Sequence, residues 1–265
     1  MQLLLGFLIA IIIAFLAYKA HSLNKSGAIA AAFTGTIIFG IGGWQWAILL
    51  LTFFITSSAL SRAFKKRKQG LEEKYSKGNQ RDAGQVFGNG GIATFFAALH
   101  FFYPNEPWVW LCFAASLAAV NADTWATELG VLNPNPPRMI TNLNKIVEKG
   151  TSGGISLIGT LASLAGSALI AFLASLLTDN WSIFPIITLA GLAGSLCDSF
   201  LGGTVQAMYY CPKDNKETEK HPLHTCGTET VHLRGWKWLD NDWVNLACGV
   251  FAVMLVMIFI LVFTL

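Results

Sequence analysis

Hydrophobic residues in this chain gather in runs of about 20 residues, and the polar connections between them alternate between short and long. A helix of that length crosses about 30 Å of hydrocarbon, the thickness of a bilayer core. The pattern therefore predicts an all-α, polytopic membrane helix bundle that forms a single transmembrane domain over residues 1–265. We place its spans, about eight in all, at residues 2–18, 26–42, 44–61, 88–103, 107–126, 152–177, 183–205 and 243–264.

Two features of this pattern leave alternatives open. The Gly42-Gly43 junction between the second and third spans is either a full turn or a kink or re-entrant hairpin. A weak internal repeat is also visible, because similar strings, residues 26–29 and 152–155, each open a span. Duplication would explain this echo, but so would the packing of small residues between membrane helices.

The charged residues indicate how the bundle lies in the membrane. Only 12% of the residues are charged, against 54% hydrophobic, and 12% is about half the value of a globular protein. All 18 lysines and arginines can be placed at one end of the spans. Positive charge in short loops marks the cytoplasmic side. We therefore expect loops 62–81, 127–150 and 206–240 in the cytosol and both termini outside. The basic balance is explained by topology, and we expect no nucleic-acid partner.

Three acidic residues lie close to the cytoplasmic ends of spans. Asp123 and Glu128 lie at the cytoplasmic end of the fifth span, and Asp198 lies about two turns before the end of the seventh. An acid inside a span costs about 2.5–3.5 kcal/mol on insertion, so it should face a cavity or a partner. Converging carboxylates suit Mg²⁺, which prefers carboxylate and phosphate oxygens. The alternative is that each acid pairs with a nearby lysine or marks the interface. We take all three as candidate catalytic residues.

The start of the eighth span adds further oxygen ligands. Asn241 or Asp242 could act as the N-cap of that helix, a position that both residue types favour. Asn245, one turn later, has no capping role and is the better functional candidate. We predict a magnesium site formed by Asp123, Asp198 and Asp242.

Two glycine-rich strings open the fourth and sixth spans, on the same face as these acids. Backbone N–H groups at a helix N-terminus bind phosphate well, although such glycines are also common for packing alone. Basic residues flank both strings. We predict a polyphosphate site whose substrate-binding residues are Arg81, Asn89, Gly90, Gly91, Lys149, Gly150, Thr151, Ser152, Gly153, Gly154, Asn241 and Asn245.

The last predicted cytosolic loop carries thiol and imidazole groups that suit zinc, which takes four ligands in structural sites. The candidate ligands are Cys211, Cys226 and His224, with Asp214 or His221 as the fourth. The alternative is a cytosolic loop with uncoordinated thiols, because Asp214 stands where a second cysteine of a CxxC pair would be. Zinc is thus a candidate cofactor beside Mg²⁺.

Several strings together identify a resemblance that covers nearly the whole chain. They are Arg81-Asp82-Ala83-Gly84-Gln85-Val86 with Asn89-Gly90-Gly91, residues 122–130 (ADTWATELG), residues 150–156 (GTSGGIS), Asp198-Ser199 with Gly202-Gly203, and residues 238–245 (WLDNDWVN). In this order they resemble the family catalogued as domain of unknown function 92. That family includes phytyl-phosphate kinases of chloroplasts and cyanobacteria and is related to CTP-dependent dolichol and phytol kinases.

The resemblance implies transfer of a phosphoryl group from a nucleoside triphosphate, with CTP favoured, to an isoprenyl monophosphate lipid. It also implies a prokaryotic inner membrane or a thylakoid-type membrane, with the active site on the cytoplasmic face. Many relatives carry a CxxC pair in the last loop, and Asp214 departs from that pattern. The main alternative is a transporter or flippase for a phosphorylated lipid or small anion, which would use similar broken helix ends. A membrane scaffold without a site would leave Asp198 unexplained.

Overall fold

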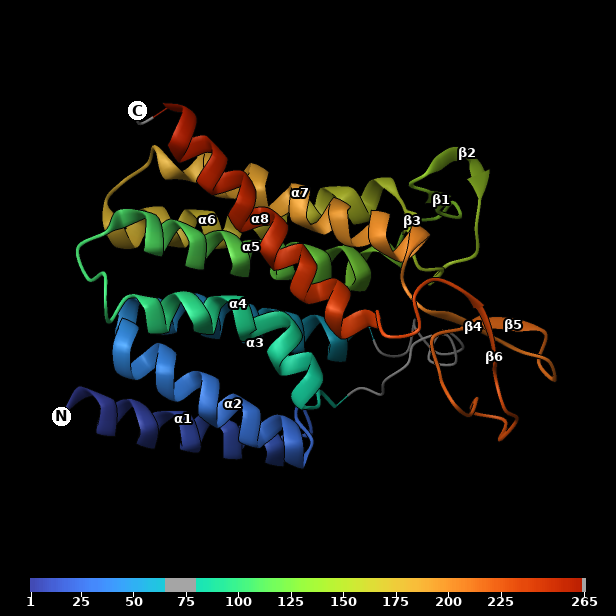
Figure 1. Ribbon diagram of the computed structural model, residues 1–265, viewed down its shortest axis with the longest axis horizontal. Helices are drawn as coiled ribbons and strands as arrows, with labels where there is room; N and C mark the ends of the chain where they lie inside the picture. Colours follow the sequence, from blue (N-terminus) through green and yellow to red (C-terminus); the bar gives the residue numbers. More distant parts are fainter. Residues whose placement is uncertain (65–79, 264–265) are drawn as a thin grey trace.

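The protein is a bundle of eight helices in the residues that the computed structural model describes, 1–64 and 80–263 (Figure 1). This arrangement confirms the predicted all-α membrane fold. The helices are α1 (Gln2–Lys19), α2 (Lys25–Ile37), α3 (Trp44–Ala63), α4 (Ala83–Leu99), α5 (Pro107–Gly130), α6 (Leu157–Thr178), α7 (Ile183–Thr204) and α8 (Asn241–Phe263), with a π-helical turn (Ile38–Gly42) that continues α2.

The bundle has two unlike ends. Both termini lie at one end, and the long loops lie at the other (Figure 1). This arrangement matches the alternation of short and long connections in the sequence. Most of the predicted loop 62–81 falls outside the described residues.

Seven helices are long and apolar enough to cross a membrane, with the π-helical turn counted as the end of α2. The remaining helix, α4, has 17 residues and would span about 25 Å. It lies alongside α5 in the bundle (Figure 1). The chain turns between α2 and α3 at Gly43, whose φ of 83° is rare for residues with a side chain. The Gly42-Gly43 junction therefore joins two separate spans.

Helix α5 lies at the centre of the bundle. It packs against α3, α4, α6, α7 and α8, and its segment from Val109 to Ala122 is buried throughout. Much of this segment is alanine, and small side chains let membrane helices approach closely. The outward faces of α1 and α8 carry exposed leucine, isoleucine and phenylalanine residues, as expected for contact with lipid.

The predicted start of the fourth span was wrong by about one turn. Helix α4 begins at Ala83 because Asp82 and Gln85 form a capping box: Gln85 N donates to Asp82 Oδ1 at 2.9 Å, and Asp82 N donates to the Gln85 side chain at 3.2 Å. Gly88, Gly90 and Gly91 therefore lie inside the helix. Their N–H groups belong to the helix ladder and cannot form the predicted phosphate site at a helix start.

The predicted start of the sixth span was also wrong. Gly150 and Gly153 have φ values of 79° and 86°, which a right-handed helix cannot contain. Residues 150–155 therefore form a loop and a short strand, and Ser156 caps α6 by accepting from Gly159 N at 3.1 Å. Residues 26–29, the other string of the internal echo, lie in the first turns of α2, so the two strings adopt different structures.

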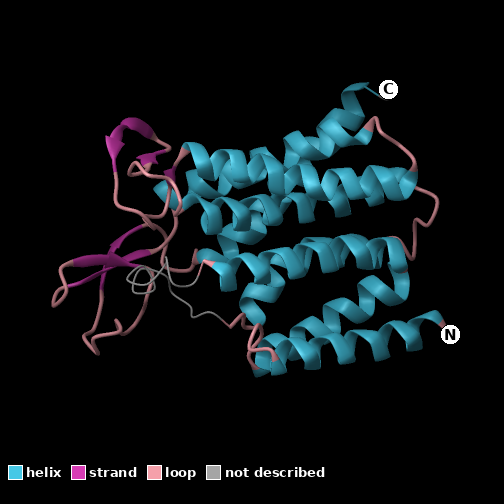
Figure 2. Ribbon diagram, turned by 180° about the vertical axis from the view of Figure 1, so that it is seen from behind, coloured by secondary structure: helices cyan, strands magenta, loops and turns pink. Residues whose placement is uncertain are grey.

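Two small antiparallel sheets form in the long loops, a detail that the helical pattern did not predict (Figure 2). The first sheet has the order β2-β1-β3, and the second has the order β5-β4-β6. Their strands are β1 (Arg138–Met139), β2 (Asn142–Ile146), β3 (Gly154–Ile155), β4 (Met208–Cys211), β5 (Lys216–Thr218) and β6 (Val231–Arg234). Both sheets lie at the end of the bundle away from the termini (Figure 2).

Candidate functional site

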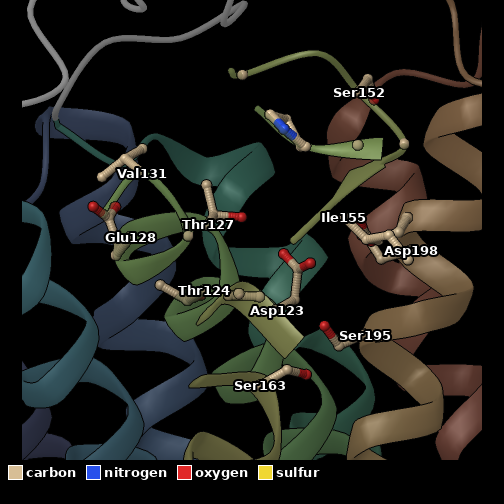
Figure 3. A pocket seen from close by; sticks show the side chains of 18 of the residues that line it. Asp123, Thr124, Thr127, Glu128, Val131, Ser152, Ile155, Ser163, Ser195 and Asp198 are labelled. Atoms are coloured by element: carbon tan, nitrogen blue, oxygen red, sulfur yellow. The ribbon is translucent and has the colours of Figure 1, made fainter. Parts of the chain in front are cut away.

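A polar cavity of about 320 Å³ opens at the end of the bundle that carries the two sheets. Figure 3 shows Asp123 near its middle, with Glu128 on one side and Asp198 on the other. Most of the residues that the sequence singled out meet here although they are far apart in the chain. The predicted residues that line the cavity are Arg81, Asn89, Asp123, Glu128, Lys149, Gly150, Thr151, Ser152, Gly153, Gly154, Asp198, Asn241 and Asn245.

The two aspartates meet because α5 and α7 pack closely one turn earlier. A Cβ atom on Gly194 would lie 2.7 Å from the Cβ atom of Ala119, so only glycine allows this approach. Asp198 and Asp123 each follow their contact residue by four positions, which is about one helical turn. Their carboxyl groups consequently lie within hydrogen-bonding distance of each other.

This pair of carboxyl groups fits a cation. Two carboxylates in contact repel each other unless a proton or a cation lies with them. The Oδ2 atom of Asp198 is buried and has no hydrogen-bond partner among the described residues. A divalent cation held by Asp123 and Asp198 would offset the repulsion between the carboxylates and would give Asp198 Oδ2 a partner. Substrate phosphates would complete the coordination shell of this cation.

Polar residues before Asp123 hold α5 in place. Asn121 is fully buried, and its amide donates to the carbonyl of Gly166 in α6 at 2.7 Å. Thr56 in α3 donates to the side-chain Oδ1 atom of Asn121 at 3.2 Å and accepts from the Trp125 indole at 3.3 Å. These bonds connect α5 to α3 and α6 close to the cavity.

Glu128 and Arg81 line the cavity, with Glu128 on the other side of Asp123 from Asp198 (Figure 3). Ser61 donates to Glu128 Oε1 at 2.7 Å. The Arg81 guanidinium lies 5.6 Å from the ring centre of Phe53 and 5.7 Å from that of Phe54. Burial lowers the pKa of Arg81 to about 10, and the Glu128 carboxylate partly opposes this shift. Arg81 therefore keeps its charge at neutral pH.

Arg81 is held by its backbone and keeps donor capacity in its side chain. Its N–H donates to the Ser22 carbonyl at 3.0 Å, and its carbonyl accepts from Asn24 N at 3.0 Å. The Nη1 atom is buried without a hydrogen-bond partner in the described part of the chain. A buried guanidinium with a spare donor is suited to an anion.

Residues 150–154 line the cavity as a loop that precedes α6, and not as the first turn of that helix. A Cβ atom on Gly153 would lie 2.4 Å from the Gly203 Cα atom, so this loop packs directly on the end of α7. Ser152 donates to Gln206 Oε1 at 2.8 Å. Lys149 donates to the carbonyls of Val131 at 3.1 Å and Asn133 at 2.6 Å, so part of its role is to hold the chain that follows α5.

Three predicted site residues lie outside the cavity lining. Gly90 lines a second, apolar pocket, and a Cβ atom on Gly91 would meet the side chain of Leu246. Asp242 is not among the lining residues. The expected cap at Asn241 or Asp242 was wrong, because Asp240 Oδ1 accepts from the backbone N–H groups of residues 242 and 243 at 3.0 and 3.2 Å.

Several residues of the cavity wall were not predicted from the sequence. Glu219 reaches the cavity from the last loop and accepts from Gln206 Nε2 at 2.9 Å. Ser163 and Ser195 lie below Asp123 (Figure 3). The position of Ser195, three residues before Asp198, was a signal that helical periodicity could have used. No local pattern indicates that Glu219 folds back onto the bundle.

A second group of potential metal ligands lies in the last loop. Cys211, Asp214, His224 and Cys226 each offer one ligand atom, and these atoms lie within 4.8 Å of one another. Hydrogen bonds with the Thr228 and His224 side chains lower the pKa of the Cys226 thiol to about 7.

His221 does not join this group. Its ring stacks on Tyr209, with ring centres 4.4 Å apart. Of the two alternatives for a fourth ligand, the geometry favours Asp214.

Comparison with known proteins gives one family. The model described as integral membrane protein DUF92 matches residues 8–253. Protein PGR of Arabidopsis thaliana is 34% identical over 271 residues, which cover 92% of this chain and 91% of that protein. An uncharacterized membrane protein of Methanocaldococcus jannaschii is 36% identical over 204 residues, or 76% of this chain and 82% of that protein.

A chloroplastic relative is more distant. Protein VTE6 of Arabidopsis thaliana is 28% identical over 233 residues, which cover 84% of this chain and 61% of that protein. No solved structure matches the chain.

Proposed function

The chain belongs to the DUF92 family of integral membrane proteins, and from this premise we propose that it is an isoprenyl-phosphate kinase. It transfers a phosphoryl group from a nucleoside triphosphate to a lipid monophosphate and forms the lipid diphosphate. The observation that carries this proposal is a close pair of half-buried carboxyl groups, Asp123 and Asp198, in a polar cavity that adjoins an apolar pocket. CTP is the favoured donor because the family resembles CTP-dependent kinases.

The apolar pocket supports a lipid acceptor. It has a volume of about 70 Å³, lies among α1, α2, α3 and α4, and shares Arg81, Gln85 and Asn89 with the polar cavity. Small residues such as Ala14, Ala17 and Gly90 form much of its wall. The pocket has room for several carbon atoms, on the order of one isoprene unit. The rest of a prenyl chain would extend toward the lipid between these helices.

Arg81 lies where the two spaces meet, which suits a molecule with a charged head and an apolar tail. Its guanidinium would bind the acceptor phosphate while the first isoprene unit occupies the apolar pocket. Gln85 and Asn89, one and two turns into α4, border both spaces and can donate hydrogen bonds to the same phosphate.

The polar cavity would hold the nucleotide phosphates beside the acceptor. Mg²⁺ held by Asp123 and Asp198 would neutralise and align these phosphates. The backbone and hydroxyl groups of residues 150–154 would bind the donor phosphates. An acceptor oxygen bonds to the terminal phosphorus as the bond to the nucleoside diphosphate breaks. The acceptor monophosphate has a second pKa near 6, so it is largely ionised at neutral pH and needs no strong base.

A carrier of phosphorylated lipids or small anions is the second candidate. Transporters place their sites near the middle of the membrane, whereas this cavity lies at one end of the bundle, beside the sheets. The acids of the site also belong to that end. We therefore place the kinase ahead of the carrier, with its active site on the cytoplasmic face of a prokaryotic inner or thylakoid-type membrane.

The direct test uses purified full-length protein in lipid nanodiscs. Labelled CTP, ATP, UTP and GTP are each incubated with Mg²⁺ and a series of isoprenyl monophosphates, and lipid diphosphate is measured. We expect product from at least one pair, and Asp123→Asn should abolish it. Absence of a nucleotide-dependent product with every acceptor would contradict the kinase. Uptake of lipid phosphate by proteoliposomes without nucleotide would instead support the carrier.

The membrane orientation can be tested by cysteine labelling. Cysteines introduced at Asn180 and Lys213 should react with impermeant reagents from opposite sides of intact vesicles, with Asn180 outside. Lys68, a similar position on the predicted cytosolic side, lies outside the described residues. Labelling of positions 180 and 213 from the same side would contradict the assignment of the cavity to the cytoplasmic face.

A further inference from the structure

We propose that Cys211, Asp214, His224 and Cys226 bind a zinc ion that fixes one wall of the polar cavity. These residues lie in the loop between α7 and α8, close to one another and connected through the loop to Glu219. Zinc binding here does not depend on the proposed kinase activity.

The fold of the loop brings the four ligands together from three short segments. Cys211 ends β4, and Asp214 lies in the tight turn that leads to β5, where Asn215 takes a φ of 53°. His224 and Cys226 follow on a further turn, in which Gly227 N donates to the His224 carbonyl at 2.9 Å. The antiparallel pairing of β4 with β5 sets the position of Asp214 relative to Cys211.

The ligand atoms lie close to the spacing of a tetrahedral zinc shell. The two sulfur atoms of Cys211 and Cys226 lie 3.5 Å apart, and His224 Nδ1 lies 3.4 Å from Cys226 Sγ and 2.9 Å from Asp214 Oδ2. Zinc bonds of about 2.3 Å to sulfur and about 2.0 Å to nitrogen or oxygen put neighbouring ligand atoms roughly 3.3–3.8 Å apart. Small inward or outward shifts would complete the shell.

The chemistry of the set selects zinc over other cations and over a disulfide. Two thiolates, an imidazole and a carboxylate suit zinc, whereas Mg²⁺ and Ca²⁺ prefer oxygen ligands alone. A disulfide needs sulfur atoms about 2.05 Å apart, and both cysteines are free. Cys211 is fully buried and His224 is 4% exposed, so the ion would be shielded from water on that side.

A short chain of contacts connects this cluster to the cavity. Thr218 is buried at the end of β5 and pairs with Tyr209 of β4, and the next residue, Glu219, lines the cavity. Gln206 then joins Glu219 to Ser152 through hydrogen bonds of 2.9 and 2.8 Å. An ion that ties the two ends of residues 211–226 together would therefore hold Glu219 against the cavity.

The first experiment measures metal in the full-length protein. It is purified in detergent without chelators, after growth with zinc, and analysed for zinc, iron, copper and nickel. We expect about one zinc per chain, as in a closed structural site. Substoichiometric zinc, below about a tenth per chain, or another metal in its place, would overturn the proposal.

Variants then identify the ligands. Cys226→Ser and His224→Gln should bind zinc at least about tenfold more weakly in competition with a colorimetric chelator. Asp214→Cys should retain zinc, because it supplies a third thiolate at the same position. His221→Gln is the matched control, since this ring stacks on Tyr209, and it should bind zinc as the unaltered protein does. Equal zinc affinity in all four variants would overturn the ligand assignment. If Cys226→Ser and His224→Gln fail to fold, the zinc content of the native protein and of Asp214→Cys still tests the site.

The connection to the cavity has a separate readout. Removing zinc with a chelator should raise amide hydrogen exchange in residues 208–224, including the segment around Glu219, while the exchange of α5 and α6 stays unchanged. If metal is bound but chelation leaves exchange in this loop unaltered, the ion does not fix the cavity wall, and that part of the proposal fails.

Discussion

The polar cavity and the apolar pocket share Arg81, Gln85 and Asn89, yet the rest of the apolar pocket comes from residues 10–90 and most of the rest of the polar cavity comes from residues 123–245. Helices α1 to α4, which surround the apolar pocket, contain no acidic residue. Helices α5 and α7 and the last loop supply the carboxyl groups of the polar cavity. Acidic side chains therefore line the polar cavity and are absent from the helices around the apolar pocket.

Small residues act in opposite ways in the two regions. One turn before the aspartates of the polar cavity, Gly194 lets α7 contact Ala119 so closely that no Cβ atom fits between them. In the apolar pocket, a Cβ atom on Gly90 would meet nothing within 4 Å. The same residue type closes helices together in one place and leaves space in the other. Composition alone does not distinguish these roles, but substitutions can.

The largest effect is expected at the carboxyl pair. Asp123→Asn and Asp198→Asn keep size and hydrogen bonding but remove charge, so each should lower kcat at least about 10²-fold. Asp179→Asn is the matched control, because Asp179 lies at the far end of the bundle in a left-handed position that asparagine accepts. Measured Mg²⁺-dependent turnover near normal in both cavity variants would refute the site.

The next effect concerns Arg81 in the wall that the two spaces share. Arg81→Gln should raise KM for the lipid phosphate roughly 10- to 100-fold, the range for a lost hydrogen bond to a charged group, with a smaller change in the KM of the nucleotide. Arg138→Gln, at an exposed position in β1, should leave both constants unchanged. If only the nucleotide KM rises, Arg81 serves the donor instead of the acceptor.

The close packing between α5 and α7 can be tested by adding a single methyl group. Gly194→Ala adds a methyl group that must push α7 from Ala119, and the resulting displacement of Asp198 should lower kcat about tenfold; a 1 Å shift can cost more. The double variant Gly194→Ala with Ala119→Gly should recover part of the loss. Gly249→Ala in α8, where the added atom meets only ordinary contacts, serves as the control.

The smallest effect is expected in the apolar pocket. Gly90→Leu should fill the space without a backbone clash and weaken binding of long prenyl phosphates about fourfold for each methylene group displaced, at about 0.8 kcal/mol each. Short-chain acceptors should be affected less, and kcat with a saturating short acceptor should be preserved. An equal change in KM for all chain lengths would show that the tail lies elsewhere.

Much of the candidate site could be predicted, because charged residues inside apolar spans raise the free energy of membrane insertion. An acid in an apolar span requires a reason, so Asp123 and Asp198 were evident before their contact was known. The helix starts were harder. The capping box at Asp82 and Gln85 and the positive φ values of Gly150 and Gly153 moved the glycine strings away from helix ends, and the predicted phosphate site there changed with them.

The sequence by itself determined the membrane bundle, the alternation of its connections and the end that carries charge, because hydrophobicity and charge act over a single span. Tertiary structure alone decided that Glu219 reaches the cavity, that Asp214 joins Cys211 and that Gly90 borders an apolar space. Each of these depends on contacts between segments far apart in the chain. Such contacts are set by how closely helices pack and where loops return, which no local pattern encodes.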